Sequence, residues 1–203
     1  MLTRWDEWYS RENLSADERI LAAPASRSAE LAVDEFKLRG KRRILDLACG
    51  VGRDTIHLKS GGLSMIGVDA SFNGLLAASQ TRKVLNAQVE FVNADARCLA
   101  FSDDCFDGIY CFGLLHEFTS QDKVGEIGRV ISETRRLLRP EGIFILTVAA
   151  GDPQAGLPRV QLFSRNMLEQ AMDGWQTLEI QEFDDVGCTN RTDYHIWYGV
   201  FEK

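Results

Sequence analysis

The chain has 203 residues, of which 45% are hydrophobic and 26% are charged, and its formal net charge at pH 7 is −7. This length and composition fit one globular domain with a substantial core. The longest strongly apolar run, residues 143–150, is far too short to cross a bilayer, and the first residues lack the apolar stretch of a secretory signal. We therefore expect a cytoplasmic location and no membrane partner. The acidic balance disfavours a nucleic-acid partner, because such proteins carry a basic surface.

Apolar periodicity and turn residues predict the secondary structure in chain order. A helix is expected over residues 14–39, interrupted at Pro24 and ended by Gly40. Apolar runs then predict strands near 44–47, 64–69, 89–93, 106–112 and 143–148, alternating with helices over 53–59, 71–85 and 122–138. A turn at 140–142 separates the last of these helices from the strand that follows. The final quarter contains two β-rich runs, 176–183 and 194–201.

Strands that alternate with helices are typical of a doubly wound α/β fold. The expected sheet is mostly parallel and seven-stranded, with helices on both faces and a C-terminal antiparallel hairpin at its edge. We interpret residues 1–203 as a single domain in three segments. Residues 1–39 form a helical lid or lead-in, residues 40–150 a cofactor-binding core, and residues 151–203 a substrate-side loop, a helix and the closing hairpin.

The most informative local pattern is a glycine turn directly after the first predicted strand. Gly50 and Gly52 allow backbone to pass close to a ligand, and the helix that follows directs its free N–H groups toward the turn. Asp46 precedes the glycines, and Thr55 stands where a dinucleotide fingerprint has its third glycine. A carboxylate at that place repels a pyrophosphate but suits an ammonium group. The pattern therefore favours a nucleotide-type cofactor with a positively charged part.

Acidic residues also follow the next two predicted strands. Asp69 ends the strand 64–69, at a spacing typical of an acid that binds ribose hydroxyls. Asp95 follows the strand 89–93 and can accept a hydrogen bond from an adenine amino group. Each aspartate alone is typical of a turn or a helix cap. Because parallel strands end at one sheet edge, the three together predict a shared ligand site there.

The segments that carry this pattern resemble those of class I S-adenosylmethionine-dependent methyltransferases. The similarity covers roughly residues 40–150. It rests on DLACGVG at 46–52, GVD at 67–69, NADA at 93–96, FDGIY at 106–110, LHE at 115–117 and LLRPEG at 137–142. The family often has glycine where this chain has Ala48, which is a mild departure.

The resemblance implies S-adenosylmethionine as cofactor and a small molecule as methyl acceptor. The predicted cofactor-binding residues follow the matched segments: Asp46, Ala48, Gly50, Gly52, Asp69, Ala70, Asp95, Ala96 and Cys111. A core position is the alternative interpretation for Cys111. The identity of the acceptor and the oligomeric state are left open by the sequence.

His116, just after the strand 106–112, is the candidate general base, since its pKa suits proton transfer at neutral pH. The alternatives are a ring that packs over the cofactor, a substrate contact or a helix cap. The segment at residues 5–9, with Trp5-Asp6-x-x-Tyr9, is similar to the start of small-molecule methyltransferases of the tellurite-resistance and thiopurine type. This resemblance implies a lid that contains Trp5 and Tyr9; the alternative is a helix docked on the body. Arg159, in a Gly- and Pro-containing loop, is a candidate for attracting an anionic acceptor.

Two other functions are compatible with the same residues. One is a cofactor-binding module or partner subunit with this fold and no turnover. The other is a nicotinamide-dependent enzyme, which Asp46 and the missing third glycine disfavour. No metal site is predicted, because none of the five cysteines forms a Cys-x-x-Cys pair. A metalloid methyltransferase that holds its substrate with several cysteines stays a minor alternative.

Overall fold

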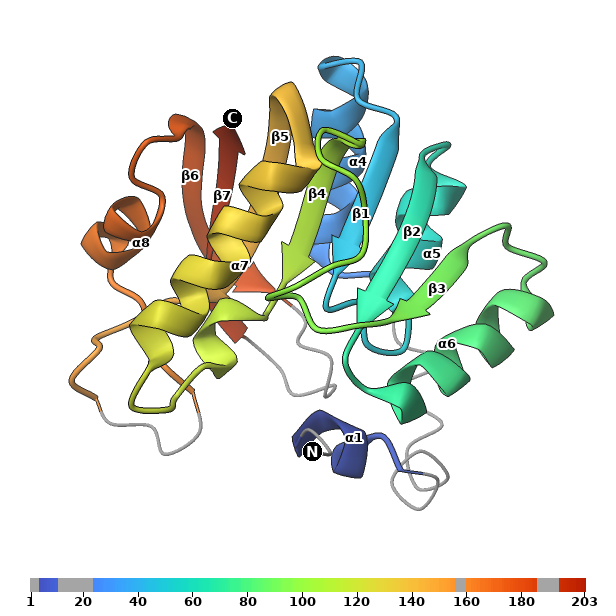
Figure 1. Cartoon of the computed structure of the whole chain (residues 1–203), viewed down its shortest axis with the longest axis horizontal. Helices are drawn as coiled ribbons and strands as arrows, with labels where there is room; N and C mark the ends of the chain where they lie inside the picture. The colour runs from blue at the N-terminus through green and yellow to red at the C-terminus, as the bar shows by residue number, and fades with distance from the viewer. Residues whose placement is uncertain (1–3, 11–23, 156–159, 186–193) are drawn as a thin grey trace.

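The computed structural model describes residues 4–10, 24–155, 160–185 and 194–203. Within them, seven strands form one sheet in the order β3-β2-β1-β4-β5-β7-β6 (Figure 1). The strands are β1 (Arg43–Leu47), β2 (Ser64–Asp69), β3 (Glu90–Asn93), β4 (Phe106–Phe112), β5 (Leu138–Ala149), β6 (Gln176–Asp185) and β7 (Tyr194–Glu202). Strands β1 to β5 pair in parallel, and β7 runs antiparallel to both β5 and β6. This confirms the doubly wound sheet with a closing hairpin.

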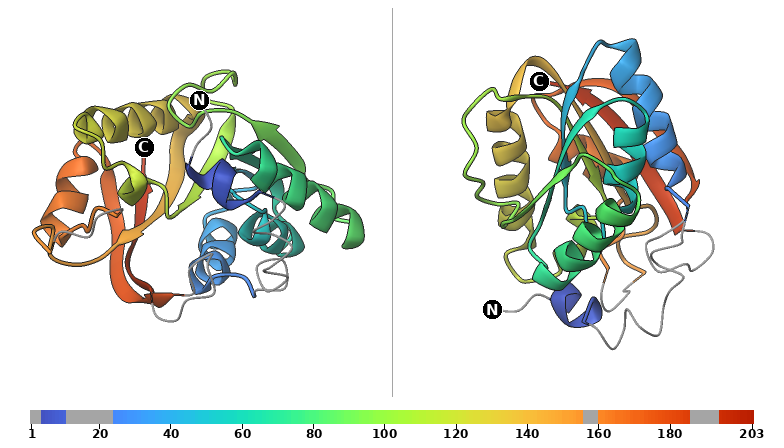
Figure 2. Two further views of the ribbon diagram at one scale, coloured as in Figure 1. Left: turned by 90° about the horizontal axis from the view of Figure 1, so that it is seen from below. Right: turned by 90° about the vertical axis from the view of Figure 1, so that its right-hand side faces the viewer.

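Helices cover both faces of the sheet. They are α1 (Arg4–Trp8), α4 (Arg27–Leu38), α5 (Arg53–Ser60), α6 (Phe72–Val84), the short 3-10 helix η1 (Leu115–Glu117), α7 (Lys123–Leu137) and α8 (Arg165–Ala171). One hydrophobic cluster joins the sheet to α7 and α8, and a second joins it to α4 and α5. Figure 2 shows α7 and α4 on opposite sides of the sheet. None of the described helices has the length and apolar character needed to cross a membrane.

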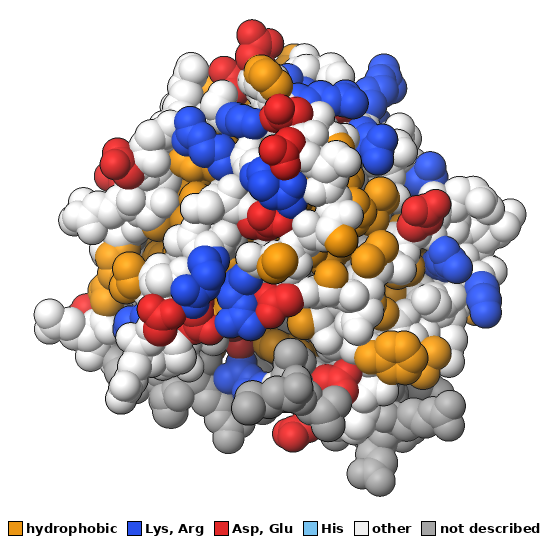
Figure 3. All heavy atoms as spheres, in the orientation of Figure 1, with side chains coloured by type: hydrophobic (Ala, Val, Ile, Leu, Met, Phe, Trp, Pro, Cys, Tyr) orange, Lys and Arg blue, Asp and Glu red, His pale blue; other side chains and the backbone are white. Residues whose placement is uncertain are grey.

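The surface over α7 carries mixed charge. Basic and acidic side chains lie next to one another on this face (Figure 3). Arg136 pairs with Asp103 at 2.6 Å, and Arg139 pairs with Asp107 at 2.5 Å. Such exposed pairs contribute little to stability, about 0–1 kcal/mol each. Arg136 at the end of α7 and Arg139 at the start of β5 are therefore each paired with an acid nearby.

Two predicted elements differ from the structure. The helix expected over 14–39 is present as α4 from Arg27 onward, whereas residues 14–23 lie outside the described part of the chain. The turn expected at 140–142 belongs to β5, which begins directly where α7 ends. Leu138 pairs with Phe106, and the register then shifts before Gly108. The turn residues thus form a bulge in the strand, with Glu141 at φ +60°.

Helix α4 is held against the sheet at its start and near its C-terminal end. Asp185, at the end of β6, accepts the backbone N–H groups of Arg27 and Ser28 at 2.8 Å each, which satisfies two free donors of the first turn. Further along, a Cβ on Gly108 of β4 would lie 2.4 Å from Cε1 of Phe36. A glycine is required there for the helix to pack so closely. The division of the chain into lid, core and substrate-side segments stays a prediction.

Candidate functional site

The sheet brings the three predicted aspartates to one edge. Asp46 lies in β1 opposite Gly67 of β2, and Asp69, the last residue of β2, lies opposite Asn93 of β3. Asp95 follows two residues after β3 ends. The side-chain amide of Asn93 and the backbone N–H of Ala94 both donate to the carbonyl of Asp69, so the loop after β3 is fixed to the end of β2. The three carboxylates therefore share the carboxyl edge of adjacent parallel strands.

The turn between β1 and α5 has a backbone that favours glycine. Ala48, Gly50 and Gly52 all have positive φ, at +65°, +53° and +76°. An alanine in this conformation costs roughly 1 kcal/mol, because its Cβ approaches the following carbonyl oxygen. The ring of Phe91 covers the turn from β3, and a Cβ on Gly52 would lie 2.7 Å from it. Gly50 and Gly52 are both buried at the edge where the aspartates meet.

Asp46 is shielded from water beneath this turn. The residue is 2% exposed, and its Oδ2 accepts a hydrogen bond from Thr55 Oγ1 at 2.5 Å. Burial raises the pKa of the Asp46 carboxyl from 3.8 to about 8, and the nearby carboxylates of Asp54 and Asp69 add to this rise. The charged form becomes favourable when a cation approaches, since a positive group offsets the cost of desolvation.

Asp69 is held by the backbone on both sides. Its Oδ2 accepts the N–H of Gly50 at 2.8 Å, and its Oδ1 accepts the N–H of Ser71 at 2.7 Å. Burial raises the pKa of this carboxyl above its usual value, and these backbone donors partly oppose the rise. The two hydrogen bonds fix the orientation of the carboxylate and leave lone pairs on both oxygens for a ligand.

Asp95 is engaged differently. The residue is exposed, and Arg97 binds its carboxylate through both the backbone N–H and the guanidinium, at 2.9 Å from each to Oδ1. Arg97 lowers the pKa of Asp95. The predicted contact with adenine therefore requires that Asp95 share its oxygens with Arg97, and it stays a prediction.

Helix α1 lies across the same edge, below the ends of the strands in Figure 1. Buried Asp6 accepts hydrogen bonds from Ser71 Oγ and from the backbone N–H of Asn73, both at 2.9 Å. Asp6 therefore binds the first turn of α6. The hydroxyl of Tyr9 lies 2.7 Å from the position of a Cβ on Gly50. Tyr9 is thus packed on the glycine turn, next to the carboxylates.

The other side of α1 contacts the segment after β4. Trp5 Nε1 donates to Glu117 Oε2 at 3.1 Å, and Arg4 forms an ion pair with the same oxygen. Burial raises the pKa of the Glu117 carboxyl. Asp6 and Glu117 together attach α1 to both sides of the sheet edge. Sequence reasoning named Trp5 and Tyr9 but gave Asp6 no role, and the spacing of the segment alone does not reveal its partner on α6.

His116 is buried in η1, at 3% exposure. Its Nδ1 accepts the backbone N–H of Ala149 at 3.1 Å, so in the neutral ring the proton lies on Nε2. Burial lowers the pKa of the ring to about 3, and the charge of Arg4 adds to this effect. The ring is therefore neutral at pH 7 and presents a donor, not an acceptor.

The remaining predicted residues take different positions. Cys111 is fully buried in the core formed with α7 and α8, in line with its alternative interpretation. Ala70 is exposed after β2, and Ala96 is half-buried after β3. Arg159 lies outside the described residues. Sequence reasoning gave Thr55 no role as a partner of Asp46. The available signal was its position one helical turn after the glycines, on the side of α5 that faces the strand with Asp46.

The side chains fit the cofactor that the sequence resemblance implies. A buried carboxylate with one side-chain donor, Asp46, suits an ammonium group. An oriented carboxylate at the end of the next strand, Asp69, suits a pair of ribose hydroxyls. Between them the bare backbone of the turn allows close approach of the ligand.

Comparison with known proteins gives the same class. A methyltransferase-domain family model matches residues 44–142. An uncharacterised methyltransferase of Synechocystis is 32% identical over 117 residues, which are 58% of this chain and 51% of that protein. The demethylmenaquinone methyltransferase of Clavibacter sepedonicus is 36% identical over 105 residues, 51% of this chain and 40% of that enzyme. The chain thus spans about half the length of the curated relatives it matches.

A solved structure shares the whole fold. Magnesium protoporphyrin IX methyltransferase from Synechocystis, with bound S-adenosylhomocysteine, superposes with a TM-score of 0.73 over 98% of this chain and 97% of that chain. At 16% identity this similarity shows the fold alone. The family-model match identifies residues 44–142 as a methyltransferase domain, and the shared fold agrees with this. Structures of the magnesium protoporphyrin IX enzyme contain bound S-adenosylhomocysteine or S-adenosylmethionine.

The raised pKa of Asp46 predicts a stability that depends on pH. Because the folded-state pKa lies above the unfolded value, the folded chain holds a proton on this carboxyl more tightly than the unfolded chain does. The contribution of Asp46 is therefore fully present below about pH 4 and is lost as the pH rises through about 8. We expect Asp46→Asn to raise the free energy of unfolding above pH 8 by about 1–3 kcal/mol and to leave it nearly unchanged near pH 4.

Urea unfolding of the ligand-free chain at these two pH values measures the effect. Asp173→Asn, a substitution at an exposed position, is the matched control. An Asp46→Asn variant whose stability follows the same pH dependence as the parent chain contradicts the assignment.

Proposed function

We propose that the chain is a methyltransferase that transfers a methyl group from S-adenosylmethionine to a small-molecule acceptor. The observation that carries the proposal is the shared edge at which Asp46, Asp69 and the glycine turn converge. All three features favour a ligand that joins a positive group to a ribose. The cytoplasmic location and the role of Arg159 stay predictions.

Different residues of this edge would bind different parts of the cofactor. When bound, S-adenosylmethionine supplies a methyl group on a positively charged sulfur. Asp69, already oriented by Gly50 and Ser71, would accept hydrogen bonds from the ribose hydroxyls. Burial keeps a proton on Asp46 in the ligand-free chain at neutral pH, because its pKa is raised to about 8; the carboxyl would lose this proton as the ammonium group binds and would then accept its hydrogen bonds. Displacement at a methyl carbon needs no metal and no covalent intermediate, so alignment and exclusion of water are the main tasks of the protein.

The position of α1 supports a lid. Its aromatic side chains, Trp5, Trp8 and Tyr9, form a cluster with Val51 of the glycine turn and Ala77 of α6. Trp5 and Tyr9 stack with ring centroids 5.6 Å apart. A covered edge suits a small acceptor, because a polymer needs an open surface. The names of two similar enzymes also specify small organic acceptors, demethylmenaquinone and magnesium protoporphyrin IX.

His116 is better suited to positioning than to proton abstraction. Its Nδ1 is occupied by the N–H of Ala149, and its ring holds no charge at neutral pH. A general base needs an accessible lone pair and a pKa near the working pH. We therefore assign His116 the role of fixing η1 to the end of β5. In this proposal the acceptor either needs no general base or is deprotonated by a group other than His116.

The alternative of a cofactor-binding module without turnover shares every contact described for the edge. The two proposals separate on methyl release, which only the enzyme shows in an acceptor screen. A nicotinamide enzyme is disfavoured by Asp46, whose carboxylate lies where a pyrophosphate would approach the turn.

Replacing Asp69 tests the cofactor site. We expect the intact chain to bind S-adenosylmethionine and Asp69→Ala to weaken binding by about 1–3 kcal/mol, the cost of losing hydrogen bonds to the ribose. Titration calorimetry measures both affinities, circular dichroism checks the fold, and Asp173→Ala serves as the control. Absence of cofactor binding to the intact chain contradicts the proposed function.

Releasing α1 tests the lid. Asp6→Ala removes the acceptor for Ser71 and Asn73, so α1 loses these hydrogen bonds to α6. We expect the cofactor to dissociate about 5- to 30-fold faster, in line with one or two lost hydrogen bonds. Stopped-flow fluorescence of the lid tryptophans follows the dissociation. Glu30→Ala, an exposed substitution on α4, is the control, and an unchanged dissociation rate for Asp6→Ala refutes the lid.

The pH profile distinguishes the two roles of His116. With a pKa of about 3, its ring gives no inflection in kcat/KM between about pH 5 and 8. We expect His116→Gln to lower kcat/KM by a similar factor at every pH in this range. A parent profile with an acidic limb that disappears in His116→Gln instead identifies the ring as the base.

A further inference from the structure

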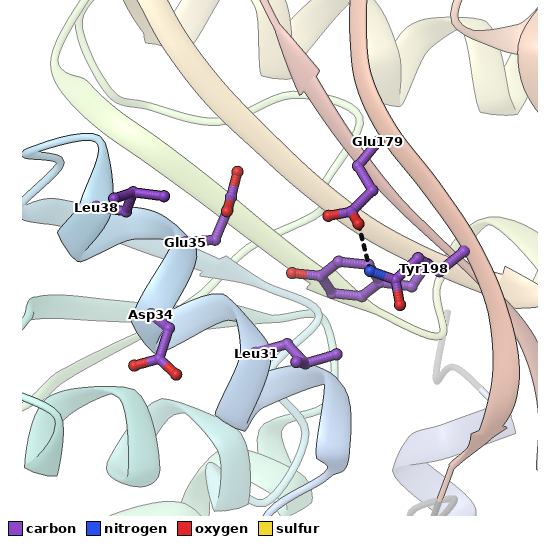
Figure 4. A pocket seen from close by; sticks show the side chains of 7 residues that line it. Leu31, Asp34, Glu35, Leu38, Glu179 and Tyr198 are labelled. Carbon is purple, nitrogen blue, oxygen red and sulfur yellow. Dashed lines mark hydrogen bonds between the residues drawn. The ribbon is translucent and has the colours of Figure 1, made fainter.

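A hollow separate from the methyltransferase site lies between α4 and the β6–β7 hairpin (Figure 4). Its volume is about 350 Å³. The hollow lies on the sheet face covered by α4 and shares no residue with the carboxyl edge. Its lining comes from one face of α4 and from neighbouring strands: Leu31, Asp34, Glu35, Leu38, Glu179, Gln181 and Tyr198.

A buried hydroxyl without a partner points into this hollow. Tyr198, on β7, is 1% exposed, and its hydroxyl has no hydrogen-bond partner within the described residues. Figure 4 shows the phenol directed from the strand toward α4. Buried hydroxyl groups almost always have partners, because an unpaired one loses its bonds to water without replacement. The arrangement therefore leaves a polar position that a ligand can satisfy.

The charges around the hydroxyl are mainly negative. Asp34 and Glu35 line the hollow from α4, and Glu179 lines it from β6. Arg39 forms an ion pair with Glu35 at 2.6 Å, and Gln181 donates a hydrogen bond to Glu179. Three carboxylates line the hollow, and one guanidinium lies beside it. Burial raises the pKa of the Tyr198 hydroxyl, and the charges of Glu35 and Glu179 raise it further.

The geometry of the hollow selects among cations. In the described part of the chain, no three His, Cys, Asp or Glu side chains lie close enough to hold a metal ion. Leu31, Leu38 and the Tyr198 ring provide apolar contacts beside the acids. A cation with a compact charged end and an alkyl part matches both features, because an ammonium group has three donors and its chain can be buried.

We propose that this hollow binds a primary alkylammonium ion. The ammonium group donates to Tyr198 Oη and to the carboxylates of Glu35 and Glu179, while the alkyl chain lies against Leu31 and Leu38.

Calorimetric titration of the full chain at neutral pH tests this proposal with butylamine as the probe. Butan-1-ol, of similar size but uncharged, and magnesium chloride are the comparison ligands. The titration is repeated with S-adenosylhomocysteine at saturation, which separates this hollow from the acidic carboxyl edge. We expect butylamine to bind at least about 10-fold more tightly than butan-1-ol and magnesium not to compete.

The variant Tyr198→Phe keeps the ring and removes only the hydroxyl, so the fold is retained. We expect it to weaken butylamine binding by about 5- to 30-fold, the loss of one or two hydrogen bonds, and Glu35→Gln to act in the same direction. Glu30→Gln, on α4 outside the hollow, serves as the control.

Equal affinity for butylamine and butan-1-ol overturns the proposal, as does an unchanged affinity in Tyr198→Phe. Loss of butylamine binding when S-adenosylhomocysteine is at saturation assigns the amine to the carboxyl edge and also overturns it. Failure of S-adenosylmethionine to bind leaves this proposal standing, because the two sites share no residue.

Discussion

The carboxyl edge of the sheet depends on one constraint, which is the burial of a carboxyl group directly before a glycine turn. Asp46 has Thr55 as its donor and other acids nearby, so the ligand-free chain carries it at a cost in stability. Such a cost is typical of a functional site, where a group is held ready for a ligand. The glycine turn, Asp69 and Tyr9 all lie around the Asp46 carboxyl.

Strand positions and sheet topology could be predicted because most of the parallel strands contain a short apolar run, and the doubly wound order follows from the alternation with helices. The start of β5 was not predictable from the local pattern. Residues 140–142 contain Pro and Gly and therefore indicate a turn, whereas in the structure the pairing of Leu138 with Phe106 extends the strand through them. Tertiary pairing overrides local turn propensity there.

The positions of Asp46 and Asp69 in the candidate site could be predicted, because each residue lies at the end of its own strand. It was less predictable where partners are distant in sequence. The role of Asp6 depends on Ser71 and Asn73, and the neutral ring of His116 depends on the backbone of Ala149. A histidine after a strand indicates a base by its ordinary pKa, and only burial reveals that this ring is uncharged at neutral pH.

The attachments of α1 have a consequence for the order of folding. Trp5 meets Glu117 across 112 positions of chain, and Asp6 meets Ser71 across 65. Contacts over such separations form only after the intervening chain has become compact. The parallel strands and α6 must therefore be assembled before the first helix can dock. In a nascent or refolding molecule this edge is therefore formed before α1 covers it.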